Sequence, residues 1–388
     1  MIETIEIQIG RPKMKHPGII AVLGFIGLVL FWGGVSYSAD IPALRNAKDS
    51  AERSRVQALI EGAQKENGLD WTGTMIEPQH SEHVIAGFKE YYGLSQLKVS
   101  YTYGNSTEII SRVNQVLKAG RIPPDIVWLV GWDWYTDLMR EKKLMRYESP
   151  FYKEYTLSEK AGNSLAGYWV SDSFTANPMW NVKELEKRGI KNFNPTSWWD
   201  FVDSKLTPLT CMANIVTSSS AVPWAIGLRK VLGDDWFIKL GKGKPAFTQK
   251  SDQGEMWVST GEYPIFLTAR TKGAQELYES GIAVGLIWPK EGQVLFPFAP
   301  VIFAGAAHPN SAKLFIDYVR SAPGTNKLAE TGVGLIYGRP GVKIPEKERR
   351  FLPPSEEIKA IPMDWNKDTT TEAVKALRGW AKKIGVGY

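Results

Sequence analysis

The sequence predicts an α/β protein with two domains, and three observations support this fold class. The chain has 388 residues, of which 43% are hydrophobic, and this length is enough for two ordinary cores. Short apolar runs alternate with segments of helical periodicity, which favours parallel sheets covered by helices on both faces. Within 281–323, the apolar runs GIAVGLIWP and LFPFAPVIFA are followed by an amphipathic segment, which predicts two buried strands and a helix that packs back on a sheet.

The first 39 residues have the pattern of an export signal. A basic stretch that ends at His16 precedes the apolar segment 18–35, and small residues follow as far as Ala39. We therefore expect a cleaved signal peptide, 1–39, and a periplasmic protein. A retained membrane anchor is the alternative, because the apolar run is near the lower limit for a membrane span.

Composition narrows the function classes. The net charge of +6 is spread along the chain without a basic block, which argues against a nucleic-acid partner. Cys211 is the only cysteine, so no intramolecular disulfide can form, and we expect it to be a buried small residue. The metalloprotease, serine-hydrolase and P-loop motifs are absent, and four His with one Cys make a Cys/His metal cluster improbable. The sequence therefore indicates neither an enzyme nor a cofactor.

The elements are predicted from their periodicity, in chain order. Residues 40–68 form a polar, helical segment with one apolar stripe. Beyond it, strands and helices alternate, and either Asn310 or Ser311 is expected to cap the helix within 281–323. The predicted strands are 70–76, 98–103, 125–130, 209–216 and 263–268, and the predicted helices are 83–92, 108–118, 135–143, 223–232 and 272–280.

Several segments resemble the extracellular solute-binding proteins of ABC importers, in the group that includes ferric-iron and sugar-phosphate or phosphonate binders. The segments are IEGAQKENG, GYWV with PMWNVKELEKRGI, SWWDF, VGLIWPKEG and HPNSAKLFIDYVRS, and their order and spacing match. The resemblance implies the type II periplasmic-binding-protein fold, in which two discontinuous lobes are joined by hinge crossovers. It places lobe 1 at 69–165 plus 300–339, lobe 2 at 166–299, and a helical tail, 340–388, against lobe 1.

Ligands of open α/β sheets bind beyond the carboxyl ends of the strands, where helix N-termini offer unpaired N–H groups to anions. Five such junctions are candidates here. At the first, His80 falls where ferric-binding relatives place an iron-coordinating His; the alternative is a loop His that bonds its neighbours. At the second, Ser106 and Thr107 resemble the family's anion loop, although Asn105 and Glu108 are also spaced like a helix-capping pair.

The third and fourth junctions add aromatic and hydroxyl groups. Trp132 and Trp134 follow a strand on a tight turn and could stack on a solute, with lobe packing as the alternative for Trp134. The segment TSSSAVPW resembles a second anion loop, although serine clusters are usually ordinary loops. Its candidate ligand-binding residues are Ser218, Ser219, Ser220 and Trp224.

The fifth junction bears most on whether the ligand is an organic anion or ferric iron. Iron-binding relatives place two adjacent Tyr after the strand that corresponds to GEYPIF, whereas this chain has Thr268, Ala269 and Arg270. A guanidinium repels Fe(III) but binds carboxylate or phosphate in bidentate fashion. Thr268 and Arg270 are therefore candidate ligand contacts, with a surface ion pair as the alternative for Arg270.

These observations lead to one expectation of function. We expect a monomeric binding protein that captures a small organic anion between its lobes and delivers it to an ABC permease. The alternatives are a ferric-iron carrier that uses His80, an exported enzyme on the same fold, and a membrane-tethered sensor.

Overall fold

The structure is a computed structural model that describes residues 41–74, 76–218, 220–248 and 250–387. The predicted signal peptide, 1–39, and Ser219 lie outside these described residues. Within the described ranges, none of the helices combines the length and the hydropathy that a membrane crossing requires.

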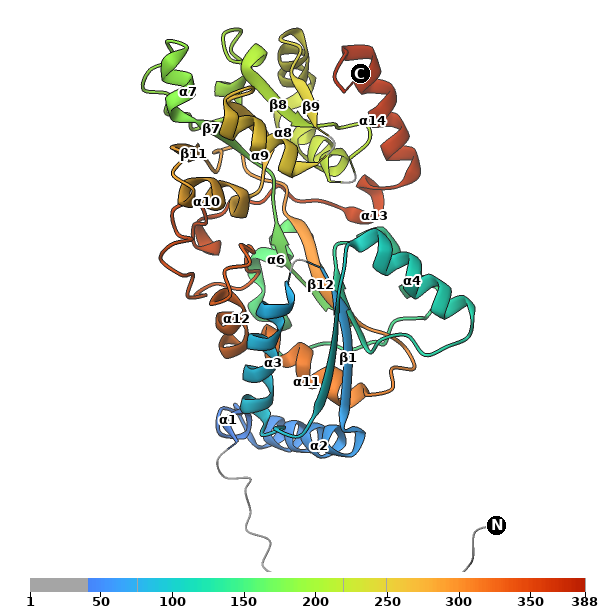
Figure 1. The fold of residues 1–388 in the computed structure, drawn as a ribbon. Helices are drawn as coiled ribbons and strands as arrows, with labels where there is room; N and C mark the ends of the chain where they lie inside the picture. The colour runs from blue at the N-terminus through green and yellow to red at the C-terminus, as the bar shows by residue number, and fades with distance from the viewer. Residues whose placement is uncertain (1–40, 75, 219, 249, 388) are drawn as a thin grey trace, which may run out of the picture. The chain divides into compact units, whose positions relative to one another are not determined.

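The first lobe is built on a five-stranded mixed sheet in the order β2-β1-β3-β12-β6. β1 pairs in parallel with both β2 and β3, whereas β12 runs antiparallel to β3 and β6. Because β12 comes late in the chain, this lobe is discontinuous in sequence (Figure 1). The strands are β1 (Gly68–Gly73), β2 (Lys98–Tyr103), β3 (Ile126–Leu129), β6 (Asp172–Phe174) and β12 (Phe296–Ile302).

The second lobe contains a second five-stranded sheet, in the order β11-β7-β10-β8-β9. β10 and β9 pair in parallel with β8, and β7 is antiparallel to β10 and β11. The strands are β7 (Asn177–Asn181), β8 (Thr210–Ala213), β9 (Ala246–Thr248), β10 (Ile265–Ala269) and β11 (Val284–Leu286). A small antiparallel pair, β4 (Ser164–Leu165) with β5 (Trp169–Val170), precedes the crossing into this lobe.

Helices cover both sheets. Those of the first lobe are α1 (Pro42–Arg45), α2 (Ser50–Glu66), α3 (Pro78–Tyr92), α4 (Ser106–Lys118), α5 (Trp132–Arg140), α6 (Thr156–Ala161), α11 (Pro309–Arg320) and α12 (Ala322–Ala329). Those of the second lobe are α7 (Val182–Lys187), α8 (Ala221–Lys242), α9 (Ser251–Thr260) and α10 (Thr271–Glu279). The sequence-predicted helix 223–232 ends where Gly233 takes a φ of 71° and breaks α8 into two segments.

Three connections join the two lobes. The chain crosses first between β6 and β7, then between β11 and β12, and last along residues 338–364. Backbone bridges hold this last stretch of chain against the other two connections, because Ile336, just before it, pairs with Ser173, and Ala360 within it pairs with Gln293. β6 and β12, which flank the first two crossings, both belong to the first sheet. Because β6 ends at Phe174, the first crossing lies about ten residues after residue 165, the predicted end of the first segment of lobe 1.

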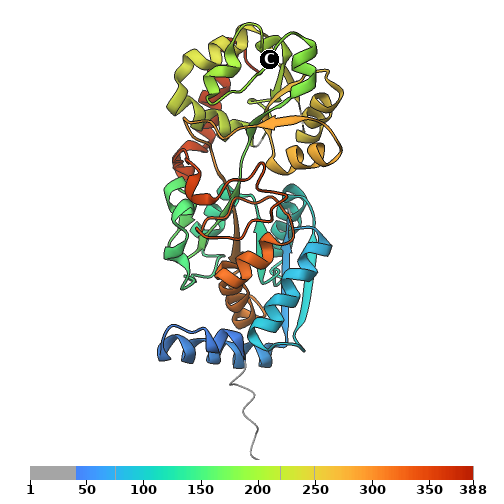
Figure 2. The same ribbon diagram turned by 90° about the vertical axis from the view of Figure 1, so that its left-hand side faces the viewer.

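The C-terminal tail differs from the sequence expectation. Its short helix α13 (Trp365–Asp368) does contact α5 of the first lobe, but α14 (Thr371–Ile384) packs on α8 of the second lobe (Figures 1 and 2). The rings of Trp380 and Phe237 meet edge to face there, with centroids 5.2 Å apart. The prediction that the tail packs on lobe 1 was wrong for α14, because its apolar stripe says only that the helix is covered and not by which lobe.

The start of α11 shows a similar long-range effect. Neither Asn310 nor Ser311 is its N-cap residue; His308 occupies that position. The carboxylate of Glu66, at the end of α2, instead accepts hydrogen bonds from the backbone N–H groups of Asn310 and Ser311, at 2.9 Å each. A carboxylate suits the positive end of a helix. The cap of α11 therefore comes from a residue more than 240 positions away.

Candidate functional site

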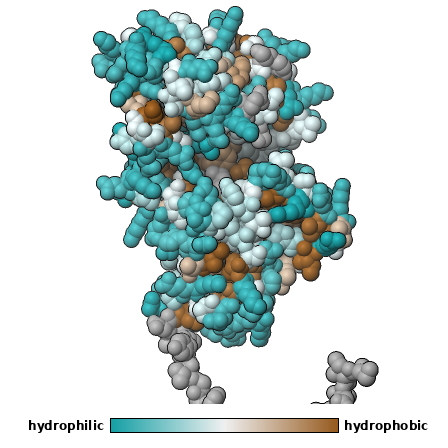
Figure 3. Space-filling view, in the orientation of Figure 1, coloured by the Kyte–Doolittle hydropathy of each residue, from teal (hydrophilic) through white to brown (hydrophobic). Residues whose placement is uncertain are grey.

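A cavity of about 910 Å³ lies between the two lobes, and five helices begin at its wall. Parallel strands β1, β2, β3, β8 and β10 end at this wall, and the helices that follow them, α3, α4, α5, α8 and α10, start there. Figure 3 shows the face of the molecule hollowed between the lobes. This is the position at which open α/β sheets bind ligands.

Two of these helix starts present free backbone donors to the cavity. The N-cap residues of α5 and α10 are Gly131 and Arg270, and neither helix has a side-chain cap. The residues that follow them, Trp132 and Thr271, line the cavity. Their first-turn N–H groups and the helix dipoles make this part of the wall attractive to an anion. α4 is different, because Asn105 Oδ1 accepts a hydrogen bond from Glu108 N at 2.9 Å, as the capping pattern predicted.

Arg270 lines the cavity, but two carboxylates already hold its guanidinium. Its Nε lies 3.1 Å from Glu255 Oε1, and its Nη2 lies 2.8 Å from Glu255 Oε2 and 2.7 Å from Asp252 Oδ1. Burial disfavours the cation, but the hydrogen bonds and charge of Glu255 outweigh it and raise the pKa of Arg270. An anion at this point would therefore have to share the guanidinium with Glu255.

Lys272 connects the lobes across the cavity. Its Nζ lies 3.2 Å from Glu77 Oε1, at the start of α3, and 3.7 Å from Glu276 Oε1 on its own helix. Burial acts to raise the pKa of Glu77, but its hydrogen bond and attraction to Lys272 outweigh this effect and lower it. Thr271 Oγ1 also donates to Gly334 O at 3.4 Å. Both contacts join α10 of the second lobe to the first lobe.

Aromatic side chains form another part of the cavity wall. Phe174 and Phe296, on the two crossover strands, stack with ring centroids 4.8 Å apart. Trp365 of α13 lies 6.2 Å from Phe296 and 6.0 Å from Trp132 by the same measure. All four residues line the cavity, so the apolar body of a solute could rest against them.

The structure brings five of the sequence-predicted site residues together. They come from both lobes, and each lines the cavity: Ser106, Trp132, Ser218, Ser220 and Arg270. Ser218 Oγ also accepts a hydrogen bond from Ala221 N, at 3.3 Å, and so serves the start of α8.

Five other predicted residues do not line the cavity, contrary to expectation. Trp224 is fully buried, packs against Trp198 and Trp236, and donates through Nε1 to Ala176 O at 3.3 Å. Thr268 is buried in β10, where its Oγ1 accepts from Ala213 N at 2.8 Å.

The other three residues that do not line the cavity are Trp134, Thr107 and His80. Trp134 donates to Asn114 Oδ1 at 2.9 Å and packs on Tyr135, so it follows the lobe-packing alternative. Thr107 is exposed on α4, and His80 lines a smaller, adjoining cavity.

Three residues that line the cavity were not predicted from the sequence: Lys272, Trp365 and Arg378. Lys272 stands two positions after Arg270, and its place in the first turn of α10 is the signal that could have found it. Trp365 and Arg378 reach the cavity from the tail, and Arg378 Nε donates to Val216 O at 2.9 Å. No sequence signal placed the tail against the second lobe.

The site chemistry does not resemble a metal centre. Among the described residues, no group of three or more His, Cys, Asp and Glu could hold a metal ion. Tyr103 is the one tyrosine among the described residues that line the cavity. Fe(III) prefers several anionic oxygen ligands, which this wall does not gather.

Comparisons with known proteins agree with this architecture. The model of the family described as bacterial extracellular solute-binding protein matches residues 79–333. None of the curated proteins matches the chain in sequence. The chain belongs to this solute-binding family.

Solved structures share the fold at low sequence identity. The fructose-6-phosphate-bound periplasmic binding protein AfuA from Actinobacillus pleuropneumoniae matches with a TM-score of 0.62 and 19% identity over 82% of this chain and 98% of its own. Iron-bound HitA from Pseudomonas aeruginosa matches with a TM-score of 0.60 and 16% identity over 82% and 99%. FutA from Trichodesmium, in complex with iron and citrate, matches with a TM-score of 0.62 and 16% identity over 82% and 99%. The type II periplasmic-binding-protein fold is therefore shown, and these identities leave the solute open.

Proposed function

We propose that this chain is the exported solute-binding component of an ABC importer, and that its solute is a small organic anion with a carboxylate or phosphate group. One observation carries the choice of an anion: the uncapped starts of α5 and α10 meet the side chains of Arg270, Lys272 and Arg378 at one cavity. Among the described residues that line the same cavity, Glu77 and Asp133 are the acidic ones, so the basic side chains of Arg270, Lys272 and Arg378 outnumber them.

The carboxylates that already pair with the basic side chains limit how an anion could bind. Arg270 and Lys272 already contact carboxylates, so the solute gains from them only by sharing or displacing Glu255 and Glu77. The backbone N–H groups of α5 and α10 do not carry this cost. We therefore assign the main anchoring role to the helix starts, with Ser106, Ser218 and Ser220 as hydroxyl donors and Arg270 as a supporting charge.

The aromatic residues of the cavity wall suit the uncharged part of the proposed solute. A volume of about 910 Å³ falls within the range of small-molecule sites and exceeds what a bare inorganic anion fills. The faces of Trp132, Trp365, Phe174 and Phe296 suit a carbon skeleton. Closure of the lobes would remove water from both ends of the solute and so strengthen its polar contacts. A sugar or short aliphatic chain that carries one anionic group meets these requirements.

Native mass spectrometry and calorimetry test this proposal. We expect the protein isolated from its native host to carry an intact organic anion, whose mass identifies it. Calorimetry with that compound should give micromolar or tighter binding, and Arg270→Ala should weaken it by roughly 10-fold, because one shared, charge-assisted hydrogen bond is lost. Bound iron, a neutral solute or turnover of the compound would each contradict the proposal. Unchanged affinity in Arg270→Ala would remove Arg270 from the site.

A further inference from the structure

A second cavity, of about 180 Å³, adjoins the solute cavity. The two share Thr271, Lys272 and Gly334 as lining residues, so the start of α10 stands between them. Its other walls come from α3, from α10 and from the connection 338–364. The smaller cavity is therefore bounded by both lobes.

A buried carboxylate without a partner lies in this cavity. The side chain of Glu348 is only 6% exposed, and neither Oε1 nor Oε2 has a hydrogen-bond partner. Lys347 and Lys272 also border the cavity, but neither lysine donates a hydrogen bond to Glu348, and Lys272 is paired with Glu77 and Glu276. Both lysines act to lower the pKa of Glu348, but burial outweighs them and raises it. An ionised carboxylate in this position is costly unless another group supplies hydrogen bonds or positive charge.

Two more unpartnered polar atoms line the same cavity. They are Gln275 Oε1, on α10, and His80 Nδ1, in the first turn of α3. Burial lowers the pKa of His80, so its ring is neutral near pH 7 and one ring nitrogen is an acceptor. The cavity thus gathers hydrogen-bond acceptors from three separate elements, together with the carboxylates of Glu276 and Glu279 at its border.

This arrangement specifies the chemistry of its occupant. An ion that only donates hydrogen bonds and carries positive charge matches a wall of acceptors around one carboxylate. The volume equals that of about six water molecules, which limits the ion to a few heavy atoms. A metal ion fits less well, because the described residues do not form a group of three or more His, Cys, Asp and Glu able to hold one.

We propose that the cavity bordered by His80, Gln275 and Glu348 is a second binding site, which takes ammonium or a short primary alkylammonium ion. The site adjoins the larger cavity and shares Thr271, Lys272 and Gly334 with it, but the proposed ion does not depend on the identity of the solute. Because its walls belong to both lobes, a bound ion would join α3 and α10 and favour the closed arrangement.

Nitrogen-15 NMR and thermal unfolding of the purified chain test this site without any solute. With ¹⁵NH₄Cl we expect a bound ammonium resonance distinct from that of the free ion, and a melting temperature that rises with ammonium chloride but not with sodium chloride at equal ionic strength. Glu348→Gln should remove both effects. Glu346→Gln, an exposed carboxylate two positions away, is the matched control and should retain them.

The outcomes separate the alternatives. An equal response to sodium, a response that persists in Glu348→Gln, or the absence of a bound resonance overturns the proposal and leaves a water-filled cavity. If Glu348→Gln folds poorly, Gln275→Leu takes its place, since Gln275 is only partly buried and its loss removes one acceptor. Failure here would leave the proposed anion site untouched, because calorimetry with the organic anion reports on the larger cavity alone.

Discussion

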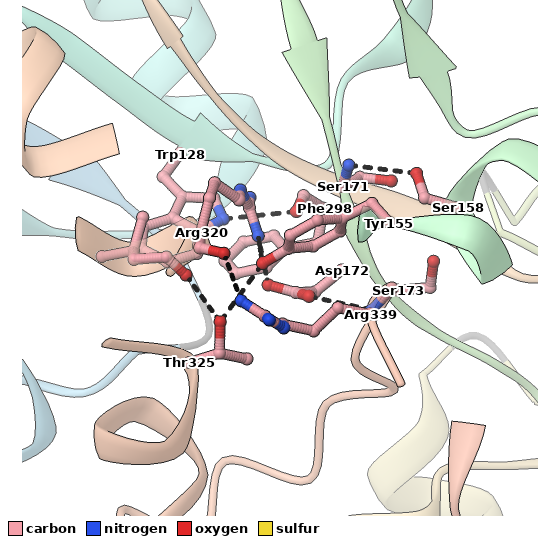
Figure 4. Close-up of polar contacts among 12 residues, drawn as sticks. Trp128, Tyr155, Ser158, Ser171, Asp172, Ser173, Phe298, Arg320, Thr325 and Arg339 are labelled. Carbon is pink, nitrogen blue, oxygen red and sulfur yellow. Dashed lines mark hydrogen bonds and ion pairs between the residues drawn. The ribbon is translucent and has the colours of Figure 1, made fainter. Parts of the chain in front are cut away.

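Arg320 and Asp172 form a fully buried ion pair at the point where the chain leaves the first lobe (Figure 4). Asp172 lies on β6, the first crossover strand, and Arg320 ends α11. Asp172 Oδ1 also accepts from Gly338 N at 3.1 Å, where the last connection begins, and Arg320 Nη1 lies 3.4 Å from Tyr155 Oη. One carboxylate thus ties two of the three interlobe connections to the core of the first lobe.

Removing one partner of this pair should destabilise the protein strongly. We expect Asp172→Asn to lower the free energy of unfolding by about 3–5 kcal/mol, because it leaves the Arg320 cation buried without a counter-charge. Urea unfolding followed by tryptophan fluorescence measures the change. The exposed pair Arg229–Asp234 is the control, and Asp234→Asn should cost about 1 kcal/mol or less. Similar effects at both sites would contradict this view of Asp172.

The pairing of Arg270 with Glu255 predicts opposite effects on solute affinity. Arg270→Ala should weaken binding of the organic anion, whereas Glu255→Gln should strengthen it by a few-fold, because the guanidinium no longer has to be shared. Calorimetry on the two single variants and the double variant measures the coupling. Weaker binding in Glu255→Gln would mean that Glu255 acts chiefly by holding Arg270 in place.

The contact between Lys272 and Glu77 should affect lobe closure. Glu77→Gln removes the ion pair between the lobes, so the unliganded protein should open more, and small-angle scattering should show a larger radius of gyration. Glu82→Gln, an exposed carboxylate on α3, is the control. An unchanged radius in Glu77→Gln would show that the ion pair does not limit opening.

Cys211 should be inert in the folded protein. Its side chain is fully buried in β8, and burial raises the pKa of the thiol far above its ordinary value. Because the thiolate is the reactive form, a thiol reagent at pH 8 should modify the native chain at least 100-fold more slowly than the chain unfolded in guanidinium, by the rough relation between thiolate fraction and rate. Rapid labelling of the native chain would contradict the buried position.

Glu348 should make stability depend on pH. Burial raises its pKa above the ordinary value of 4.5, while Lys347 and Lys272 act to lower it and Glu279 to raise it. Between pH 4.5 and the raised pKa the folded chain binds more protons than the unfolded chain, so the stabilisation present below pH 4.5 is lost as the pH rises. Unfolding curves at several pH values between 4 and 8, without ammonium, should show this loss in the natural chain and not in Glu348→Gln. Parallel curves for the two proteins would refute it.

Local features were predictable because they depend on neighbouring residues. Asn105 caps α4 through Glu108 as its spacing predicted, and the strands predicted at 98–103 and 263–268 form β2 and β10, with β10 observed at Ile265–Ala269. Trp224 shows the limit of such reasoning: its place in a serine-rich helix start suggested a ligand contact, whereas packing against Trp198 and Trp236 buries it completely. The sequence pattern does not distinguish an aromatic ring at a cavity wall from one in the core.

The amino-acid sequence by itself determined the α/β class and the most strongly periodic strands and helices, because periodicity and capping depend on neighbouring residues, and the order of its motifs gave the resemblance to the family. Only the tertiary structure decided which groups share a space. It placed Glu66 at the start of α11, the tail residue Trp365 in the solute cavity, and Glu348 beside His80 and Gln275. Such contacts join residues far apart in the chain, and they depend on how the sheets and their crossovers pack rather than on any local pattern.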